Sequence, residues 1–277
     1  MIQSNPQTFL DIATTAALTA GAVLEKHWGN ITDIQEKGSG GDLVTEVDKA
    51  SEAVLLEVLQ RHLPDHAILA EESGQINPDE SNPYLWAIDP LDGTTNYAHG
   101  FPVACVSVGL LIHGKPEVGV IYNPFYQELY QAAKGRGATL NQRPIQVSQT
   151  AQLSQSLLAT GFAYDRRETP DNNYAEFCYL THQTQGVRRA GAAALDLAAV
   201  ACGRYDGYWE RGIKPWDVVA GIIIVEEAGG KVTAYDGSPL DLKSGRILAT
   251  NGAVHKSLSQ TLQNTPPLSQ WPLKTSF

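Results

Sequence analysis

Two aspartates, Asp89 and Asp92, end an apolar run in the stretch WAIDPLDGTTNYAHGFP at residues 86–102. A strand that leaves a hydrophobic core cannot bury two carboxylates cheaply unless a partner neutralises them, and a divalent cation is the strongest such partner. Pro90 favours an extended conformation at Asp89, and Gly93 allows an unusual backbone turn after Asp92. The stretch therefore predicts a buried strand that ends in a metal-binding turn.

Three further acidic groups fit the same chemistry: Glu71–Glu72 at the end of HAILAEE, Asp217 in KPWD, and Asp48, three residues after Thr45. Each group alone also has an ordinary explanation, as a solvated strand end, a first-turn acid on a helix or a capping box. The Asp89–Asp92 pair is harder to explain in this way, because Thr94 and Thr95 follow it. Their hydroxyls and amides at a helix N-terminus suit an anion. Two carboxylates, an open backbone and amide donors are the parts of a metal-assisted phosphate site.

The string DPLDGT also has a second interpretation. Aspartyl-phosphate phosphatases of the haloacid dehalogenase class carry DxDGT, with the first Asp as nucleophile. Here two residues separate the acids, which changes the relative direction of their side chains along a strand. The motif lies a third of the way along the chain rather than at its start, and neither GxSxG nor CxxxxxR occurs. The sequence therefore favours metal-assisted hydrolysis.

The composition limits the partners and the compartment. With 30 Asp+Glu against 20 Lys+Arg, the net charge of −10 makes a broad nucleic-acid footprint unlikely. The three cysteines form no CxxC pair, so we expect reduced thiols in the cytoplasm and neither a disulfide frame nor a zinc site. The apolar segment near 6–28 lacks a basic start, which favours an amphipathic helix over a signal peptide. No apolar run of 18 residues suggests a membrane span.

Two halves are expected, joined without a linker into one compact unit. Residues 1–147 predict an α+β half, with helices near 6–28 and 45–64, strands at HAILAEE and LWAIDP, and an antiparallel meander over 103–147. Residues 148–277 alternate strands with helices, which is typical of a layered α/β arrangement that completes the active site. The final stretch TPPLSQWPLKTSF is expected to fray.

Five ordered motifs resemble those of the inositol monophosphatase family of Mg²⁺-dependent, lithium-sensitive sugar-phosphate phosphatases. They are DLVTEVDK (42–49), AEES (70–73), WAIDPLDGTTNYAHGFP (86–102), RRAGAAALDLAAVACGRYDGYWE (188–210) and KPWDVVAGIIIVEEAGG (214–230). The resemblance covers nearly the whole chain. It implies a layered αβαβα sandwich, like that of inositol monophosphatase and fructose-1,6-bisphosphatase, and usually a homodimer. It also implies an enzyme that hydrolyses inositol 1-phosphate to inositol and phosphate with two or three Mg²⁺ per subunit.

The resemblance assigns metal ligands to five matched residues: Glu71, Asp89, the Leu91 carbonyl, Asp92 and Asp217. The first Mg²⁺ would be held by Glu71, Asp89 and Leu91, and the second by Asp89, Asp92 and Asp217. Glu71 would also help to hold a weaker third ion through water, which places it among the catalytic residues.

The resemblance assigns the remaining roles to residues around these ligands. Gly93 and Thr94 would donate amides to the phosphate, and Thr94, with Thr45 and Asp48 behind it, would orient and deprotonate the attacking water. The substrate contacts would be completed by Ala193, Glu210 and Asp217, and Lys37 matches a loop lysine near the metals.

Substrate identity stays open at this point. Ala192 stands where the family commonly has Ser or Thr, which removes a hydroxyl from the substrate side, and TGFAYDRRETP (160–170) should line the leaving-group pocket. Histidinol phosphate, fructose 1,6-bisphosphate and 3′-phosphoadenosine 5′-phosphate are alternative substrates. A bisphosphate would need an extra cationic contact, for which Arg166, Arg167 and Arg211 are candidates. A different hypothesis is that the protein is chiefly a regulatory binding partner of the transcription machinery.

Overall fold

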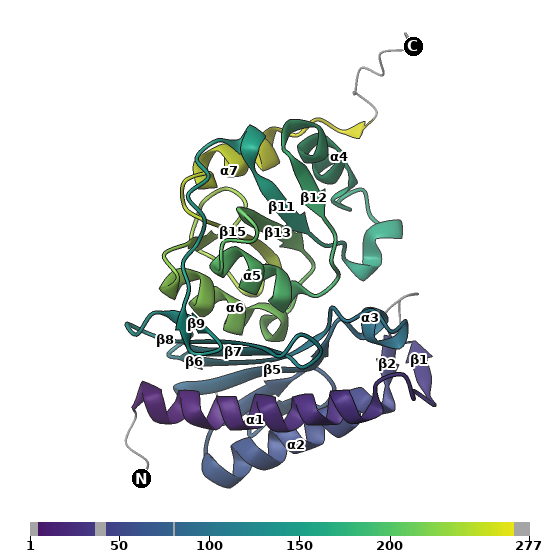
Figure 1. The fold of residues 1–277 in the computed structure, drawn as a ribbon, viewed down its shortest axis with the longest axis vertical. Coiled ribbons are helices and arrows are strands. Elements are labelled where there is room, and N and C mark those ends of the chain that lie inside the picture. Colours follow the sequence, from purple (N-terminus) through teal and green to yellow (C-terminus); the bar gives the residue numbers. More distant parts are fainter. Residues whose placement is uncertain (1–4, 37–42, 80, 269–277) are drawn as a thin grey trace.

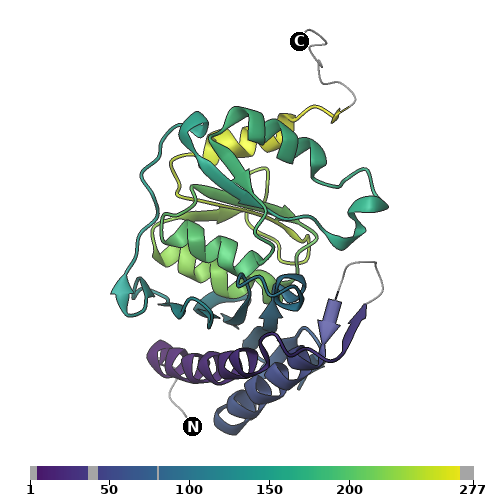
Figure 2. The ribbon, with the colours of Figure 1, turned by 45° about the vertical axis from the view of Figure 1, so that its right-hand side comes forward.

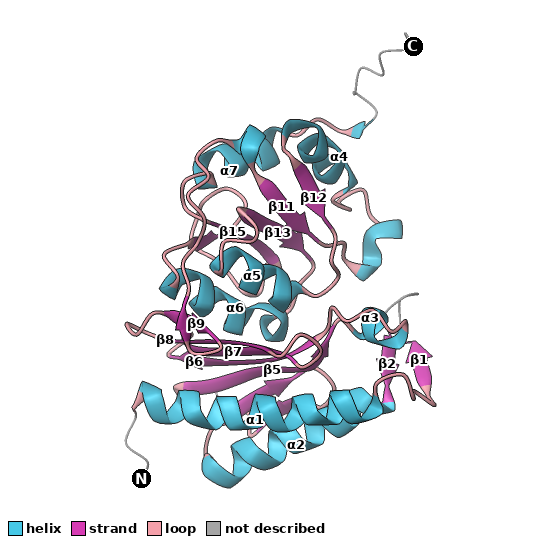
Figure 3. Ribbon diagram, in the orientation of Figure 1, coloured by secondary structure: helices cyan, strands magenta, loops and turns pink. Residues whose placement is uncertain are grey.

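Five layers of helix, sheet, helix, sheet and helix make up the computed structural model, which describes residues 5–36, 43–79 and 81–268 (Figures 1 and 3). The three helical layers are α1 (Pro6–His27) with α2 (Glu46–His62), α5 (Ala193–Ala201) with α6 (Pro215–Glu227), and α4 (Tyr174–Gln183) with α7 (His255–Asn264). Figure 2 shows α5 and α6 enclosed between the two sheets. The predicted αβαβα sandwich is therefore confirmed.

The first sheet has eight strands in the order β10-β9-β8-β7-β6-β5-β3-β4. Their bounds are β3 Ala67–Ala70, β4 Gly74–Ile76, β5 Tyr84–Asp92, β6 Cys105–Ile112, β7 Lys115–Asn123, β8 Glu128–Ala133, β9 Ala138–Leu140 and β10 Arg143–Pro144. Strands β6 to β10 form the meander predicted over 103–147, β5 pairs antiparallel with β6, and among the described strands of this sheet only β3 and β5 pair in parallel. Because both strands of a parallel pair end at the same edge, their acidic C-terminal residues lie together.

The second sheet has five strands in the order β12-β11-β13-β15-β14. Their bounds are β11 Leu157–Thr160, β12 Gly186–Arg188, β13 Gly207–Arg211, β14 Lys231–Thr233 and β15 Arg246–Thr250. The smaller elements are the ribbon β1 (Ile34–Glu36) with β2 (Leu43–Thr45), α3 (Thr94–Ala98), and the 3₁₀ turns η1 (Leu153–Gln155) and η2 (Tyr164–Arg167). The sequence did not predict β1, β2, β4 or α7.

Glycines in the first sheet allow the central helix α6 to pack closely on it. A Cβ at Gly119 of β7 would lie 2.3 Å from the Ala220 carbonyl oxygen, and one at Gly109 of β6 would lie 2.6 Å from Val219 Cγ1. The same helix is apolar almost all round, as a helix between two sheets must be. This packing joins the two halves, while the division at residue 147 stays a prediction.

Helix α1 covers the outer face of the first sheet. Its buried side is lined by small residues, Ala13, Ala16, Ala17 and Ala20, all fully buried. By length and composition α1 could cross a membrane, so the expectation that no segment is long and apolar enough to do so was wrong. Nevertheless, 44% of the apolar stretch of α1 is buried inside the fold. The buried face of the helix packs on β6, β7 and β8.

The start of α7 is fixed by a buried histidine, His255, whose two ring nitrogens each lie 2.9 Å from a hydroxyl, of Thr233 and of Thr250. Burial lowers the pKa of His255 from its ordinary 6.5 to about 4. In the unfolded chain His255 therefore binds a proton near pH 6.5, whereas in the folded chain it binds one only near pH 4. The free energy of unfolding consequently falls as the pH drops from 6.5 to 4.

This linkage gives a testable loss of stability in acid. Between pH 7 and pH 4 the free energy of unfolding should lose up to about 3 kcal/mol from this group alone. Urea unfolding of the wild type and of His255→Gln at both pH values measures it. We expect a smaller acid-induced loss in the variant; equal losses in the two proteins would contradict the role of His255.

Candidate active site

Strand β5 ends in a β-bulge that directs Asp89 and Asp92 to the same face. Asp89 pairs with Ser107 and Asp92 with Cys105, so three steps along β5 oppose two steps along β6. Ser107 and Cys105 are two residues apart in β6, so their side chains lie on the same face of the sheet. Residues directly opposite each other on paired strands also share a face, so Asp89 and Asp92 lie on that face as well. Pro90 lies inside the bulge, where its missing N–H costs no ladder hydrogen bond. The extra residue in DPLD therefore brings the two carboxylates together.

The turn that carries Glu71 follows the neighbouring parallel strand β3. The Glu71 amide donates to the Ile88 carbonyl at 3.2 Å, which places this turn beside the end of β5. Glu52 of α2 is buried and accepts from the Glu72 amide at 2.9 Å and from the Ser73 hydroxyl. The predicted acidic turn is thus held by the buried carboxylate of Glu52, a residue that the sequence analysis did not single out.

Four carboxylates repel one another at this edge. Burial raises the pKa of Asp89 well above its ordinary value, and the charges of Glu71, Asp92 and Asp217 add to the effect. Burial also raises the pKa of Asp92 to about 7 and that of Asp217 well above its usual range. Because like charges raise one another's pKa only at short range, the four acids lie close together.

These acids suit a divalent cation by donor chemistry, because Mg²⁺ prefers carboxylate and carbonyl oxygens. Among the described residues, no three His, Cys, Asp or Glu side chains already enclose a metal position. The acids instead hold backbone amides: Asp89 accepts from Leu91 at 2.9 Å, and Asp217 from Lys214 at 2.6 Å. Since each carboxylate has two oxygens, one can keep its amide while the other binds a cation.

Asp92 also caps helix α5 across the interface between the halves. Its two oxygens accept from the amides of Ala193 at 3.2 Å and Ala194 at 2.7 Å. The N-cap residue Ala192 has no hydroxyl to supply this bond, so an acid from the other half satisfies the helix end. Ala193, a predicted substrate contact, therefore lies directly beside a predicted metal ligand.

Thr45, Asp48 and Thr94, which the resemblance groups together, form a hydrogen-bonded chain. Thr45 caps α2, and its amide and hydroxyl donate to Asp48 Oδ2 at 2.8 and 2.6 Å. Thr94 Oγ1 lies 3.0 Å from Asp48 Oδ1 and 3.0 Å from the Leu91 carbonyl oxygen. Burial raises the pKa of Asp48, while the hydrogen bonds from the threonines lower it. The predicted capping box of Thr45 and Asp48 is thus present, and its Asp48 also contacts Thr94 of the candidate site.

Gly93 makes the turn between β5 and α3 and has φ +93°. A Cβ at this position would lie 2.7 Å from the Val103 carbonyl oxygen, so a larger residue is excluded by both conformation and space. Its carbonyl accepts from Tyr97, and the amides of Gly93 and Thr94 lie at the start of α3. Two adjacent amides at the start of a helix can bind an anion.

Glu210 lies at the end of β13 on the opposite side of the site. It accepts from the Tyr208 hydroxyl at 2.5 Å, and burial raises its pKa to about 7. Asp196 of α5 is a further buried acid that the sequence did not single out, and burial, Glu210 and Asp92 raise its pKa. Its one signal in the sequence is an acid inside the apolar run AAALDLAAVA. Lys37 lies outside the described residues.

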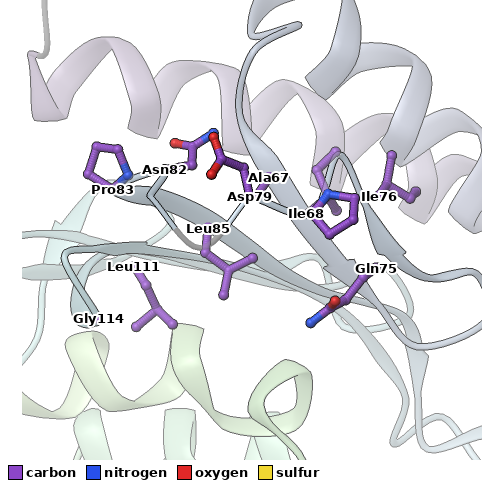
Figure 4. A pocket seen from close by; sticks show the side chains of 11 residues that line it. Ala67, Ile68, Gln75, Ile76, Asp79, Asn82, Pro83, Leu85, Leu111 and Gly114 are labelled. Carbon is purple, nitrogen blue, oxygen red and sulfur yellow. The ribbon is translucent and has the colours of Figure 1, made fainter.

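A separate cavity lies away from these acids. It has a volume of about 370 Å³ and is lined by the β3–β4 edge, residues 78–79 and 82–83, Leu85, Leu111 and Gly114 (Figure 4). A second cavity of about 670 Å³ lies on the other side of the same loop, beside His66 and Tyr84. Neither is lined by a predicted site residue, so neither is the candidate active site.

Comparison with known proteins identifies the family of the chain. The model of the inositol monophosphatase family matches residues 5–266. An inositol-1-monophosphatase of Synechocystis is 66% identical over 97% of this chain and 92% of its own, and the Nus factor SuhB of Pseudomonas aeruginosa is 43% identical over 94% and 98%. The structure of an inositol monophosphatase from Anabaena superposes with a TM-score of 0.89 at 67% identity, over 96% of this chain and 99% of that one. The chain belongs to the inositol monophosphatase family and is a phosphatase.

Proposed function

We propose that the protein is a Mg²⁺-dependent phosphomonoesterase that hydrolyses inositol 1-phosphate to inositol and phosphate. The observation that carries this proposal is the β5 bulge, which directs Asp89 and Asp92 to one face beside Glu71 and Asp217. Two or three Mg²⁺ would be held by these four carboxylates and the Leu91 carbonyl. When bound, such ions neutralise the phosphate and lower the pKa of a water molecule.

The chain's own residues would position the water and the phosphate. Thr94 can donate its hydroxyl proton to Asp48 and accept a hydrogen bond from the attacking water, because Asp48 Oδ1 lies 3.0 Å from Thr94 Oγ1. Thr45 holds the other Asp48 oxygen, which fixes the direction of the carboxylate. The amides of Gly93 and Thr94 would bind the phosphate, since the start of a helix favours an anion.

The arginines near the leaving-group side favour a monophosphate. Arg211 is paired with Asp165 and Asp171, and Arg166 donates to the Ala163 carbonyl at 3.2 Å. Of the three candidate contacts for a distal phosphate, Arg211 is thus already paired with two carboxylates. This supports inositol 1-phosphate over fructose 1,6-bisphosphate or 3′-phosphoadenosine 5′-phosphate, and histidinol phosphate is the monophosphate alternative.

Regulatory binding to the transcription machinery is the alternative function. It is motivated by the relative named a Nus factor, at 43% identity. A pull-down of transcription proteins that survives Asp89→Asn would favour it, because that change removes a proposed metal ligand and leaves the surface alone. A homodimer, a cytoplasmic location and lithium sensitivity also stay predictions.

The substrate is tested by phosphate release from four esters: inositol 1-phosphate, histidinol phosphate, fructose 1,6-bisphosphate and 3′-phosphoadenosine 5′-phosphate. Each is measured with Mg²⁺, without Mg²⁺, and with Mg²⁺ plus Li⁺. We expect the largest kcat/KM for inositol 1-phosphate, and loss of activity without Mg²⁺. A larger kcat/KM for another ester would contradict inositol 1-phosphate as the substrate but leave the proposed mechanism standing. If no ester released phosphate in a Mg²⁺-dependent way, both the substrate and the mechanism would be contradicted.

A further inference from the structure

The segment between β11 and α4, residues 161–173, is closed at its base by one buried amide. The Asn173 side chain donates to the Thr160 hydroxyl and to the Gly161 carbonyl, each at 2.8 Å, and accepts from the Trp209 indole at 2.7 Å. Asn173 is 3% exposed and has φ +66°. Both ends of the segment are therefore fixed to each other and to β13.

The outer part of the same segment is held by Arg211, the last residue of β13. Its guanidinium donates to both oxygens of Asp165, at 2.7 and 2.8 Å, and its Nε lies 3.3 Å from Asp171 Oδ2. Asp171 also pairs with Arg246 of the neighbouring strand β15. The Arg211 side chain is only 13% exposed, whereas the Asp165 side chain is 47% exposed, so the strength of this contact comes from its planar two-point geometry rather than from burial of both partners.

Glu210 and Arg211 are neighbours in β13 and point to opposite faces of the sheet. Tyr208 and Glu210 share the face toward α5 and α6, because their side chains are hydrogen-bonded. Trp209 packs on the other face, toward α4 and α7, and Arg211 follows it by two residues. The segment thus passes around the end of β13, and Arg211 holds it on the face of the sheet that packs toward α4 and α7.

On the front face the segment lies directly against the Glu210 carboxylate. A Cβ at Gly161 would be 2.2 Å from both Glu210 oxygens, so the backbone at Gly161 limits where that carboxylate can lie. Any shift of the segment changes the space beside Glu210.

We propose that Arg211 is a positioning residue that sets the specificity for the alcohol part of the substrate. Through Asp165 and Asp171 it fixes the segment 161–173 against Glu210, on the side where the inositol ring would bind. The phosphate contacts at Gly93 and Thr94 belong to another element and do not depend on it. This inference rests on the proposed function, since it assigns Glu210 to the alcohol side of the site.

The test compares two esters with the same phosphate and different alcohols: inositol 1-phosphate and p-nitrophenyl phosphate, each with Mg²⁺. For Arg211→Met we expect KM for inositol 1-phosphate to rise about tenfold, with kcat changed less than threefold, because the ring site is loosened while the metal site is kept. KM for p-nitrophenyl phosphate should stay within twofold. Arg211→Lys keeps the charge and loses the two-point contact, so it should restore only part of the loss.

Arg204→Met is the matched control. Arg204 makes a comparable two-point contact, with Glu128, but on β8 and away from Glu210. This variant should change neither KM. A double-mutant cycle of Arg211→Met with Asp165→Asn, on inositol 1-phosphate, should be non-additive because both changes release the same anchor.

The outcomes separate this inference from the proposed function. Wild-type turnover of inositol 1-phosphate with an unchanged KM in Arg211→Met would overturn the positioning role alone. Equal rises of KM for both esters would also overturn it, since they would indicate general loosening. If Arg211→Met does not fold, Asp165→Asn alone carries the test, with the same ester-selective rise expected. No wild-type turnover of either ester would overturn the proposed function itself, and this inference with it.

Discussion

Asp89→Asn is expected to lower kcat for inositol 1-phosphate about a thousandfold, because a ligand shared by two Mg²⁺ is worth several kcal/mol in the transition state. The chain should still fold. Asp89 is buried among like charges, so removing its charge relieves repulsion from Glu71, Asp92 and Asp217. Without Mg²⁺, the Tm of the variant should equal or exceed that of the wild type.

The stability measurement separates a lost ligand from a damaged fold. Mg²⁺ binds the folded chain alone and should therefore raise the Tm of the wild type, whereas Asp89→Asn should lose most of that rise. Asp79→Asn, on the exposed loop before β5, is the control and should keep both the turnover and the Mg²⁺-induced rise. Near-normal Mg²⁺-dependent turnover in Asp89→Asn would contradict its assignment as a ligand.

Thr94→Ala is expected to lower kcat about a hundredfold or more while leaving Mg²⁺ binding within about twofold, since orientation and deprotonation of the water typically contribute factors of this size. The Thr94 hydroxyl is the link between Asp48 and the site, at 3.0 Å. Thr94→Ser keeps this hydroxyl and should retain most of the activity. Steady-state kinetics over a Mg²⁺ titration give both quantities.

The neighbouring threonine supplies the control for this change. Thr95 lies in the same helix α3 and is exposed, so Thr95→Ala removes a hydroxyl from the same turn without touching Asp48. We expect kcat within about twofold of the wild type. If the two alanine variants were equally active, Thr94 would have no part in the reaction.

Local sequence patterns predicted most of the fold because they record which face of each element is buried. The run LWAIDP and the meander over 103–147 became buried strands, and Thr45 became the cap of α2. Two of the missed strands, β1 and β4, lack such a pattern. Strand β1 is exposed at all three residues, and β4 alternates only between half-buried and exposed. Helix α7 does carry such a pattern, since His255, Leu258, Ser259 and Leu262 share its buried side, and the sequence analysis missed it.

The acids of the site could be named from their chemistry and from the resemblance, but their arrangement could not. The bulge that unites Asp89 and Asp92 is defined only by the register against β6, a partner that no local pattern specifies. Asp92 meets the amide of Ala193 from a position 101 residues earlier in the chain, and Arg211 meets Asp165 across 46 residues. Contacts of this kind depend on how the two sheets pack, which the spacing of residues along the chain does not encode.

The most direct test of the metal site is the number of Mg²⁺ bound per chain. Equilibrium dialysis of the wild-type protein against Mg²⁺, followed by metal analysis, measures it, with Asp89→Asn and the exposed-site control Asp11→Asn alongside. The carboxylate cluster predicts two or three Mg²⁺ in the wild type and in Asp11→Asn, and at least one fewer in Asp89→Asn. Equal binding by all three proteins, or no binding by the wild type, would contradict a metal centre at the end of β5.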